Sequence, residues 1–228
     1  MKTIKTEVQK ALETLALPTK GEATYMQESE NSTQLQASFS TLNDPNLKQM
    51  LDGAKRFCAD MMRGENPHWL SFLGSTGAGK THLAKQINSF FLRHLEGRLI
   101  PNQNLTRTQH RMRGGFVSWR RQSERLRNGD YDAMRGIRED YFVVLDDIGS
   151  EYKAKSDFIT AKLDEIIDSR LGKWTVITAN LSLEQISEHL DVRIASRLLR
   201  GGSEVIDVDV PDYNLRDIDQ NKILDECV

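Results

Sequence analysis

Cysteine is scarce in this sequence, and long apolar runs are missing from it. The 228 residues include two cysteines, Cys58 and Cys227. Two cysteines so far apart form neither a disulfide framework nor a zinc site, which fits a reducing compartment. The N-terminal residues lack the apolar segment of a signal peptide, and no run approaches transmembrane length. We therefore expect a soluble, cytoplasmic protein with no membrane partner.

A strong overall charge is also lacking. The net charge is −2, so the composition as a whole does not call for an anionic partner. The charge is nevertheless uneven, because residues 93–138 hold eleven arginines, no lysine and four acidic residues. This local net charge of +7 leaves about −9 for the rest of the chain. The basic segment is therefore the place to look for a polyanion partner.

The most specific motif lies at residues 74–81, which fit G-x-x-x-x-G-K-[ST]. A short apolar run precedes it and apolar residues at helical spacing follow it, which is the context of a phosphate-binding loop. Backbone N–H groups of such a loop, and the positive end of the following helix, hold phosphate oxygens. Lys80 supplies a cation for the β- and γ-phosphates, and the Thr81 hydroxyl is a ligand for Mg²⁺. The predicted ATP-binding residues are Gly74, Ser75, Thr76, Gly77, Ala78, Gly79, Lys80 and Thr81.

Strand and helix patterns alternate five times along the chain. The apolar runs at 69–73, 116–119, 141–145, 174–180 and 204–210 read as strands, with helical periodicity between them. This alternation predicts an α/β fold, a five-stranded parallel sheet with helices on both faces. We expect an N-terminal amphipathic helix and polar linker over residues 1–38, an ATPase domain over 39–216 and a polar tail over 217–228. The N-terminal helix either folds back onto the domain or docks on a partner.

Three polar residues follow the predicted central strands. Asp146 comes directly after four apolar strand residues, where a nucleoside triphosphatase holds Mg²⁺ through a carboxylate. Asp147 points elsewhere and is free to orient a water toward the γ-phosphate. Asn180 ends the next strand and can donate to the γ-phosphate or hold the attacking water. The plainer alternatives are two capping acids and a turn asparagine.

Two arginines lie four residues apart on a predicted helix near the C-terminus, Arg193 and Arg197. Arginine on a helix surface is normally only solvated. An arginine supplied by a neighbouring subunit can, however, stabilise the charge of a phosphoryl-transfer transition state. Such a role requires a homo-oligomer that is assembled through the ATP site.

The order of these motifs resembles the AAA+ ATPases, and within them the bacterial DnaC/IstB-like helicase loaders. The resemblance is carried by residues 79–84, 145–151, 177–182, 193–198 and 212–213. It implies a RecA-like core without a full C-terminal lid, with Asn180 as the sensor. It also implies that Arg197 is the first candidate for the arginine finger, the arginine that one subunit supplies to the ATP site of its neighbour. Arg193 is the second candidate. Loaders of this group bind single-stranded DNA in a spiral of subunits and grip the replicative helicase through an N-terminal extension, here residues 1–38.

The basic segment gains a candidate role from this resemblance. Arginines between the second and third strands would track a phosphate backbone in a manner that depends on salt but little on sequence. The predicted DNA-binding residues are Arg120, Arg121, Arg125 and Arg127. The alternative is a solvated basic face. Residues 94–114 look like an insertion of unknown role.

The function expected from these features is an ATP-dependent helicase loader that hydrolyses ATP and acts in the initiation of DNA replication. A transposition helper ATPase shares the same core. A non-hydrolysing nucleotide switch is a third hypothesis, whereas a P-loop kinase would need an arginine-bearing lid that is not apparent.

Overall fold

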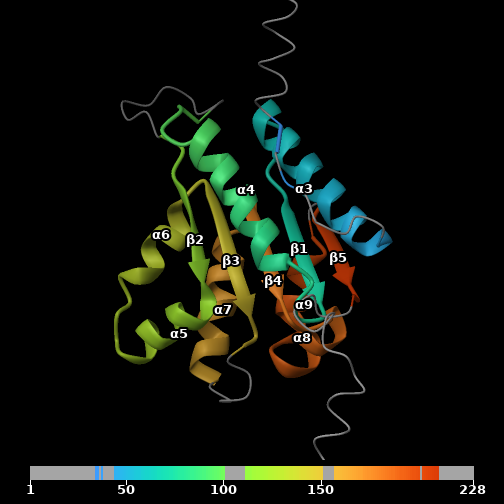
Figure 1. Cartoon of the computed structure of the whole chain (residues 1–228). Helices are drawn as coiled ribbons and strands as arrows, with labels where there is room; N and C mark the ends of the chain where they lie inside the picture. Colours follow the sequence, from blue (N-terminus) through green and yellow to red (C-terminus); the bar gives the residue numbers. More distant parts are fainter. Residues whose placement is uncertain are drawn as a thin grey trace, which may run out of the picture. The chain divides into compact units, whose positions relative to one another are not determined.

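The computed structural model describes residues 34–35, 37, 44–100, 111–150, 157–200 and 202–210. Five strands in these ranges form one parallel sheet, in the spatial order β2-β3-β4-β1-β5 (Figure 1). The strands are β1 (Trp69–Gly74), β2 (Gly114–Ser118), β3 (Phe142–Ile148), β4 (Trp174–Ala179) and β5 (Glu204–Val208). The predicted five-stranded parallel sheet is therefore confirmed, and the structure adds the strand order.

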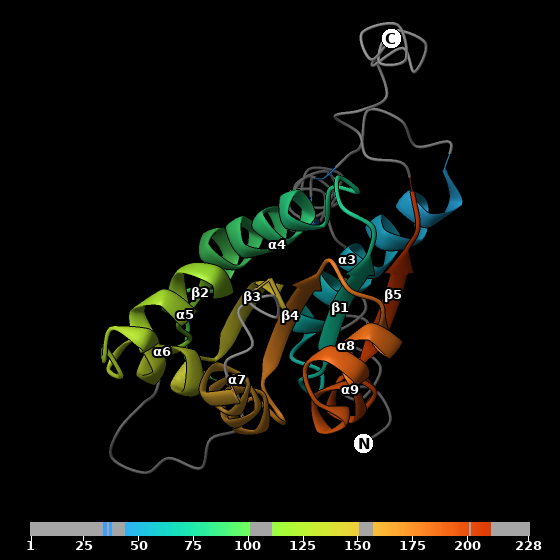
Figure 2. The same ribbon diagram turned by 90° about the horizontal axis from the view of Figure 1, so that it is seen from below.

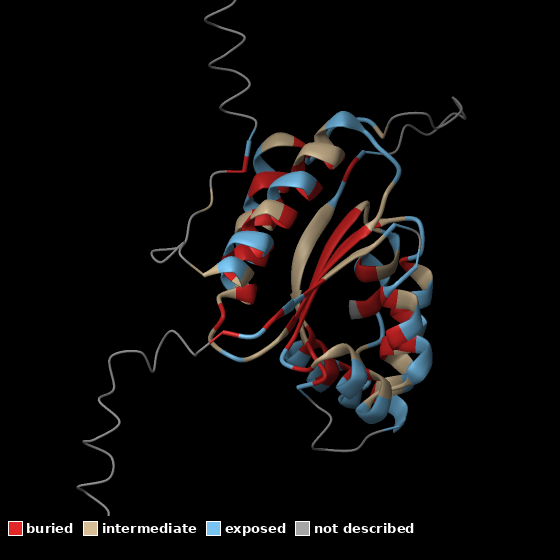
Figure 3. Cartoon of the chain, turned by 90° about the vertical axis from the view of Figure 1, so that its right-hand side faces the viewer, coloured by how far each residue is buried: buried red, intermediate tan, exposed pale blue. Residues whose placement is uncertain are grey.

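Helices cover both faces of this sheet, as the end-on view shows (Figure 2). One face carries α3 (Pro45–Arg63) and α4 (Lys80–His94). The other face carries α5 (Trp119–Arg127), α6 (Ala133–Glu139), α7 (Asp157–Ser169), α8 (Leu183–His189) and α9 (Val192–Leu198). Because both faces are covered, the central strands are buried along almost their whole length (Figure 3).

Local sequence signals set the ends of α3. The carboxylate of Asp44 accepts a hydrogen bond from the N–H of Asn46 at 2.8 Å, and Pro45 occupies the first turn. Gly64 ends the helix with φ 70°, a left-handed conformation that glycine adopts without steric cost. The buried side of α3 then packs on the sheet beside β5 and β1.

The basic segment at 120–138 forms two helices, α5 and α6. The chain turns between them at Gly129, whose φ is 82°. A fully buried arginine, Arg170, ties this pair to the sheet, because its guanidinium donates to the carbonyls of Ile137 and Asp140 ahead of β3 and of Trp174 in β4. The orientation of α6 against the sheet is therefore fixed by hydrogen bonds to one side chain.

Some predicted elements lie outside the described residues. These are the amphipathic helix within residues 1–38, most of the linker after it and the polar tail over 217–228. Leu35, which the sequence places in the linker, is buried in the core cluster beside α3. No helix in the described ranges is long and apolar enough to cross a membrane.

Candidate nucleotide-binding site

The predicted phosphate-binding loop lies between β1 and α4, the strand–loop–helix arrangement expected from the motif. Gly74 ends the strand with φ 103°, and a Cβ at this position would lie 2.4 Å from the carbonyl oxygen of Val208. Gly77 and Gly79 also have positive φ, 71° and 82°. Glycine is required at the first position by space and is favoured at the other two by backbone conformation. The loop therefore turns tightly at the N-terminus of α4.

Ser75 anchors this loop to the end of β5. Its N–H donates to the carbonyl of Val208 at 2.9 Å. Its hydroxyl oxygen lies 2.8 Å from the carbonyl of Val210 and accepts from the Val210 N–H at 3.1 Å. The sequence predicts Ser75 only as a member of the phosphate loop. Ser75 also fixes the loop to β5, which is distant in sequence but adjacent to β1 in the sheet. This second role depends on strand order, and the motif does not predict it.

Lys80 is buried within the loop. Its ammonium group donates to the carbonyls of Gly74 at 3.0 Å and Ser75 at 2.5 Å. Burial lowers the pKa of Lys80 to about 8, and the nearby carboxylates of Asp147 and Asp146 oppose this shift. The two hydrogen bonds thus hold the Lys80 ammonium group against the backbone of the loop.

Thr81 and Asp146 meet across the site, although they are 65 residues apart in the sequence. The Thr81 hydroxyl donates to the Asp146 carboxylate at 2.8 Å, and the Thr178 hydroxyl of β4 donates to the same oxygen at 2.8 Å. A hydroxyl and a carboxylate are the hard oxygen donors that Mg²⁺ prefers, and Mg²⁺ sites with substrate phosphates need only one or two protein ligands. The pair therefore fits this ion. No cluster of three or more acidic, histidine or cysteine ligands occurs in the described ranges.

Thr178 is a residue that sequence reasoning missed. Besides its bond to Asp146, its hydroxyl accepts the backbone N–H of Asp147 at 2.8 Å. It thereby fixes both acidic residues against β4. A polar residue near the end of a strand, two positions before Asn180, is the signal that could have found it.

Asp147 leaves the regular strand geometry. It has φ 61°, the one positive φ of a non-glycine residue in the described ranges, and the β3–β4 register shifts between Leu145 and Ile148. This turn directs its carboxylate away from that of Asp146 and toward Asn180, whose amide donates to Asp147 at 2.9 Å. Burial, followed by the charge of Asp146, raises the pKa of Asp147. The structure thus brings together Asp146, Asp147 and Asn180 from two neighbouring strands.

The two arginines of α9 have different surroundings. The Arg197 side chain is only 16% exposed and forms ion pairs with Asp164 and Asp168 of α7. The Arg193 side chain is 67% exposed, and its partner is Asp191, two residues away at the start of the same helix. Val192 and Leu199 on the same helix are exposed apolar residues. Arg197 therefore holds α9 against α7 within the chain, whereas Arg193 extends into solvent.

The four predicted DNA-binding arginines lie on α5, and all are exposed. Arg125 forms an ion pair with Asp130 at 2.7 Å. Arg120, Arg121 and Arg127 have no acidic partner in the described part of the chain. Helix α5 begins directly after Ser118, which pairs with Asp146 in the sheet register. Helix α5 therefore starts beside the Thr81–Asp146 pair. The positive charge of Arg120 partly opposes the rise in the pKa of Asp147.

The strand order, the phosphate loop and the acidic pair near the end of β3 match the RecA-like AAA+ P-loop fold. Comparison with solved structures finds the same fold in DnaI and in the DnaC helicase loader. DnaI is 23% identical over 78% of this chain and 90% of its own, with a TM-score of 0.58. The DnaC helicase loader is 22% identical over 78% of this chain and 97% of its own, with a TM-score of 0.58.

A third similar structure is the replication initiator DnaA bound to AMPPCP and single-stranded DNA. It is 14% identical over 75% of this chain and 52% of its own, with a TM-score of 0.52. No protein-family model matches the sequence, and no curated protein sequence matches it. The likeness is therefore one of fold.

Proposed function

We propose that this protein is an ATPase that loads a replicative helicase onto single-stranded DNA. The observation that carries the proposal is the joining of Thr81, Asp146 and Thr178 beside the phosphate loop, with Asp147 and Asn180 next to them. This constellation matches the requirements of phosphoryl transfer, in which positioning and charge stabilisation supply the catalysis. The fold shared with DnaI and DnaC supports the particular role.

Each residue of the site has a distinct task in this proposal. The loop N–H groups and Lys80 bind the triphosphate. Thr81 and Asp146 hold Mg²⁺, which neutralises charge on the phosphates when it is bound. Asp147 orients the attacking water and accepts its proton, and its contact with Asn180 sets the direction of its carboxylate. Asn180 is also close enough to this carboxylate to respond to the γ-phosphate as a sensor.

The arginine finger is the part of the proposal that needs a second subunit. Arg197 would have to leave two carboxylates of its own chain before it could reach a neighbour. Arg193 has to leave only an exposed pair with Asp191. The exposed Val192 and Leu199 beside it are apolar surface that a neighbouring subunit would cover. The surroundings of the two residues therefore favour Arg193 as the finger, with Arg197 in a supporting role.

A complementation experiment tests this assembly. The Lys80→Ala subunit cannot bind ATP but keeps its arginines, and the Arg193→Ala subunit binds ATP but lacks the finger. We expect neither variant alone to hydrolyse ATP and their mixture to recover activity, because each supplies what the other lacks. The same mixture is made with Arg197→Ala in place of Arg193→Ala. Absence of recovery in both mixtures, with nucleotide binding intact in the arginine variants, contradicts an arginine supplied in trans.

The helicase partner is proposed through residues 1–38, which lie outside the described residues. A transposition helper ATPase of the IstB type shares the whole core, so the partner separates the two hypotheses. Crosslinked capture from the native host, with the full chain and with a chain lacking residues 1–38, tests them. Recovery of a replicative helicase only with the full chain supports the loader, and recovery of a transposase supports the helper.

A further inference from the structure

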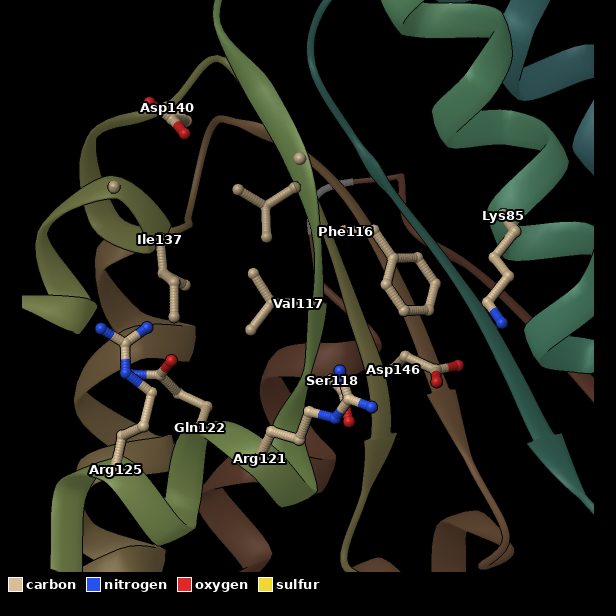
Figure 4. Close-up of a pocket in the computed structure, with 13 residues that line it drawn as sticks. Lys85, Phe116, Val117, Ser118, Arg121, Gln122, Arg125, Ile137, Asp140 and Asp146 are labelled. Atoms are coloured by element: carbon tan, nitrogen blue, oxygen red, sulfur yellow. The ribbon is translucent and has the colours of Figure 1, made fainter. Parts of the chain in front are cut away.

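A cavity of about 690 Å³ lies along the outer edge of the sheet, at the free edge of β2 and between α4, α5 and α6 (Figure 4). It is separate from the phosphate loop, although Asp146 contributes to one end of its lining. Its volume is in the range of small-molecule sites, which span ~300–1,000 Å³. The arginines predicted to bind DNA reach it only in part, since Arg121 and Arg125 line it and Arg120 and Arg127 do not.

One side of the cavity has an aliphatic wall. Figure 4 shows Val117 and Ile137 facing the same space on one side of β2, with Gln122 and Arg125 at its lower end. The wall is continued by Val143, and both Ile137 and Val143 are almost fully buried. Because these side chains belong to a strand, a helix and a neighbouring strand, the slot is held by the fold itself. It offers a flat apolar group a place out of water.

A polar group at the end of this slot lacks a partner. Gln122 is 5% exposed, and its amide nitrogen has no hydrogen-bond partner among the described residues. Leaving a buried amide without a partner is unfavourable, so such groups in folded proteins normally have a hydrogen-bond acceptor. Gln122 is part of the cavity lining, so a group bound in the cavity is a candidate for the missing acceptor.

The rim of the cavity is cationic. Lys85 and Arg121 line it, and neither has an acidic partner in the described part of the chain. The two carboxylates of the lining are already engaged, Asp140 with Arg113 at 3.4 Å and Asp146 with Thr81 and Thr178. The Lys85 ammonium group lies 5.6 Å from the centroid of the Phe116 ring, which also lines the cavity. The cavity therefore combines an apolar slot, an unpaired amide donor and two cations without acidic partners at its mouth.

We propose that this cavity binds one nucleotide unit, with the base in the slot and the phosphate at Arg121. A base provides a flat apolar face that fits the slot. The acceptor atoms on the edge of the base provide the hydrogen-bond partner that the Gln122 amide nitrogen lacks. The phosphate provides the anion for the rim. The unit has two possible sources, a nucleotide of the bound single strand or a free mononucleotide. The first source rests on the proposed function, and the site itself does not.

Position 136 allows the cavity to be filled without distorting the fold. Gly136 lines the cavity, and a Cβ there would meet only a side-chain oxygen of Asp140 at 3.6 Å, an ordinary contact. Gly136→Leu should occupy the slot, and Gly136→Ala is the control for the gain in helix propensity. Gln122→Met removes the amide donor at similar length. Circular dichroism and thermal melting check that each variant is folded.

The test compares a thymidine oligonucleotide with a strand of equal phosphate number whose internal bases are removed. Anisotropy is measured with the full chain and a non-hydrolysable ATP analogue, so that the phosphate loop is filled. We expect the wild type to bind the intact strand about tenfold more tightly, a typical effect of base contacts. Gly136→Leu and Gln122→Met should bind the intact strand as weakly as the wild type binds the abasic one, and Gly136→Ala should behave as wild type.

A second arm titrates thymidine monophosphate in the same buffer, followed by saturation-transfer NMR. Mononucleotide binding that is lost in Gly136→Leu, with no preference for intact strands, supports the site and assigns it to a free nucleotide. Failure of the chain to bind any strand contradicts the proposed function and leaves this arm to decide on the cavity. A base preference that Gly136→Leu does not change overturns the proposal. The proposal is also overturned if the chain neither prefers the intact strand nor binds thymidine monophosphate. The free edge of β2 would then be a candidate for pairing with a peptide strand instead.

Discussion

The amide of Asn180 donates to the carboxylate of Asp147 at 2.9 Å, across 33 residues of sequence. The two side chains come from the ends of adjacent strands, β4 and β3, and meet because Asp147 takes φ 61°. Asp147 would otherwise follow the alternation of the strand. A non-glycine residue in this conformation costs roughly 1 kcal/mol or more, and such strain persists where the surrounding structure holds it. Here two hydrogen bonds hold it, one that the Asp147 N–H donates to the Thr178 hydroxyl and one that its carboxylate accepts from the Asn180 amide.

Replacing Asp147 by Asn should abolish most hydrolysis while leaving ATP binding intact. Asparagine tolerates positive φ and can still accept the Asn180 hydrogen bond, but it cannot take a proton from water. We expect kcat to fall by ~10²–10⁴ with little change in the Kd for ATP. Phosphate release and nucleotide titration measure the two quantities, and Asp157→Asn at the start of α7 is the control. Unchanged turnover would favour the non-hydrolysing switch.

Replacing Lys80 by Met should abolish ATP binding and yet stabilise the nucleotide-free protein. The pKa of Lys80 is lowered by burial from 10.5 to about 8, so below about pH 8 the folded protein bears the cost of a buried charge. Between these two values the unfolded chain holds a proton that the folded protein has released, so wild-type stability rises with pH. We expect Lys80→Met to be more stable by roughly 1–3 kcal/mol near neutral pH, a gain that shrinks in alkaline solution.

Urea unfolding at about pH 7 and about pH 10 measures this difference. Lys85→Met on the exposed side of the same helix is the matched control, since Lys85 is not buried. A stability gain of equal size at both pH values would show that the charge of Lys80 is not its cause.

Arg197 and Arg193 should differ in their effect on stability. Arg197→Ala leaves the partly buried Asp164 without its partner, and we expect the free energy of unfolding to fall by about 2–4 kcal/mol. Arg193→Ala removes an exposed pair, so the free energy of unfolding should stay nearly unchanged. Urea unfolding of both variants measures this, and Arg197→Ala with Asp164→Ala should recover part of the loss. Equal destabilisation by the two variants would contradict their separate roles.

The arginines of α5 should determine the salt dependence of single-strand binding. Each phosphate contact with a single strand contributes ~0.7 to the slope of log K against log salt concentration. Changing Arg120, Arg121 and Arg127 to Gln removes three such contacts and should therefore reduce the slope by about 2. Adding Arg125→Gln should change it little further, because Asp130 already holds that side chain. Arg56→Gln on α3, across the sheet, is the control. An identical slope in the triple variant would remove α5 from the binding surface.

Local patterns predict those parts of the protein that depend on neighbours in sequence. The phosphate loop is one such part, because its glycines, Lys80 and Thr81 act on one turn of backbone. The helix start at Asp44 and Pro45 is another, since its capping bonds span two or three residues. The continuous apolar run at the start of β3 likewise predicts a strand with both faces covered.

Strand order and side-chain partners were decided only in three dimensions. The placement of β1 beside β5 brings Ser75 to Val210, and that of β4 beside β3 brings Thr178 to Asp146. No spacing in the sequence encodes either contact. The same packing places Asp164 beside Arg197, so it separates two arginines that the sequence presents as alike. Motifs whose residues are close together in the sequence can be predicted from it. Contacts between distant segments depend instead on how the whole sheet and its helices pack.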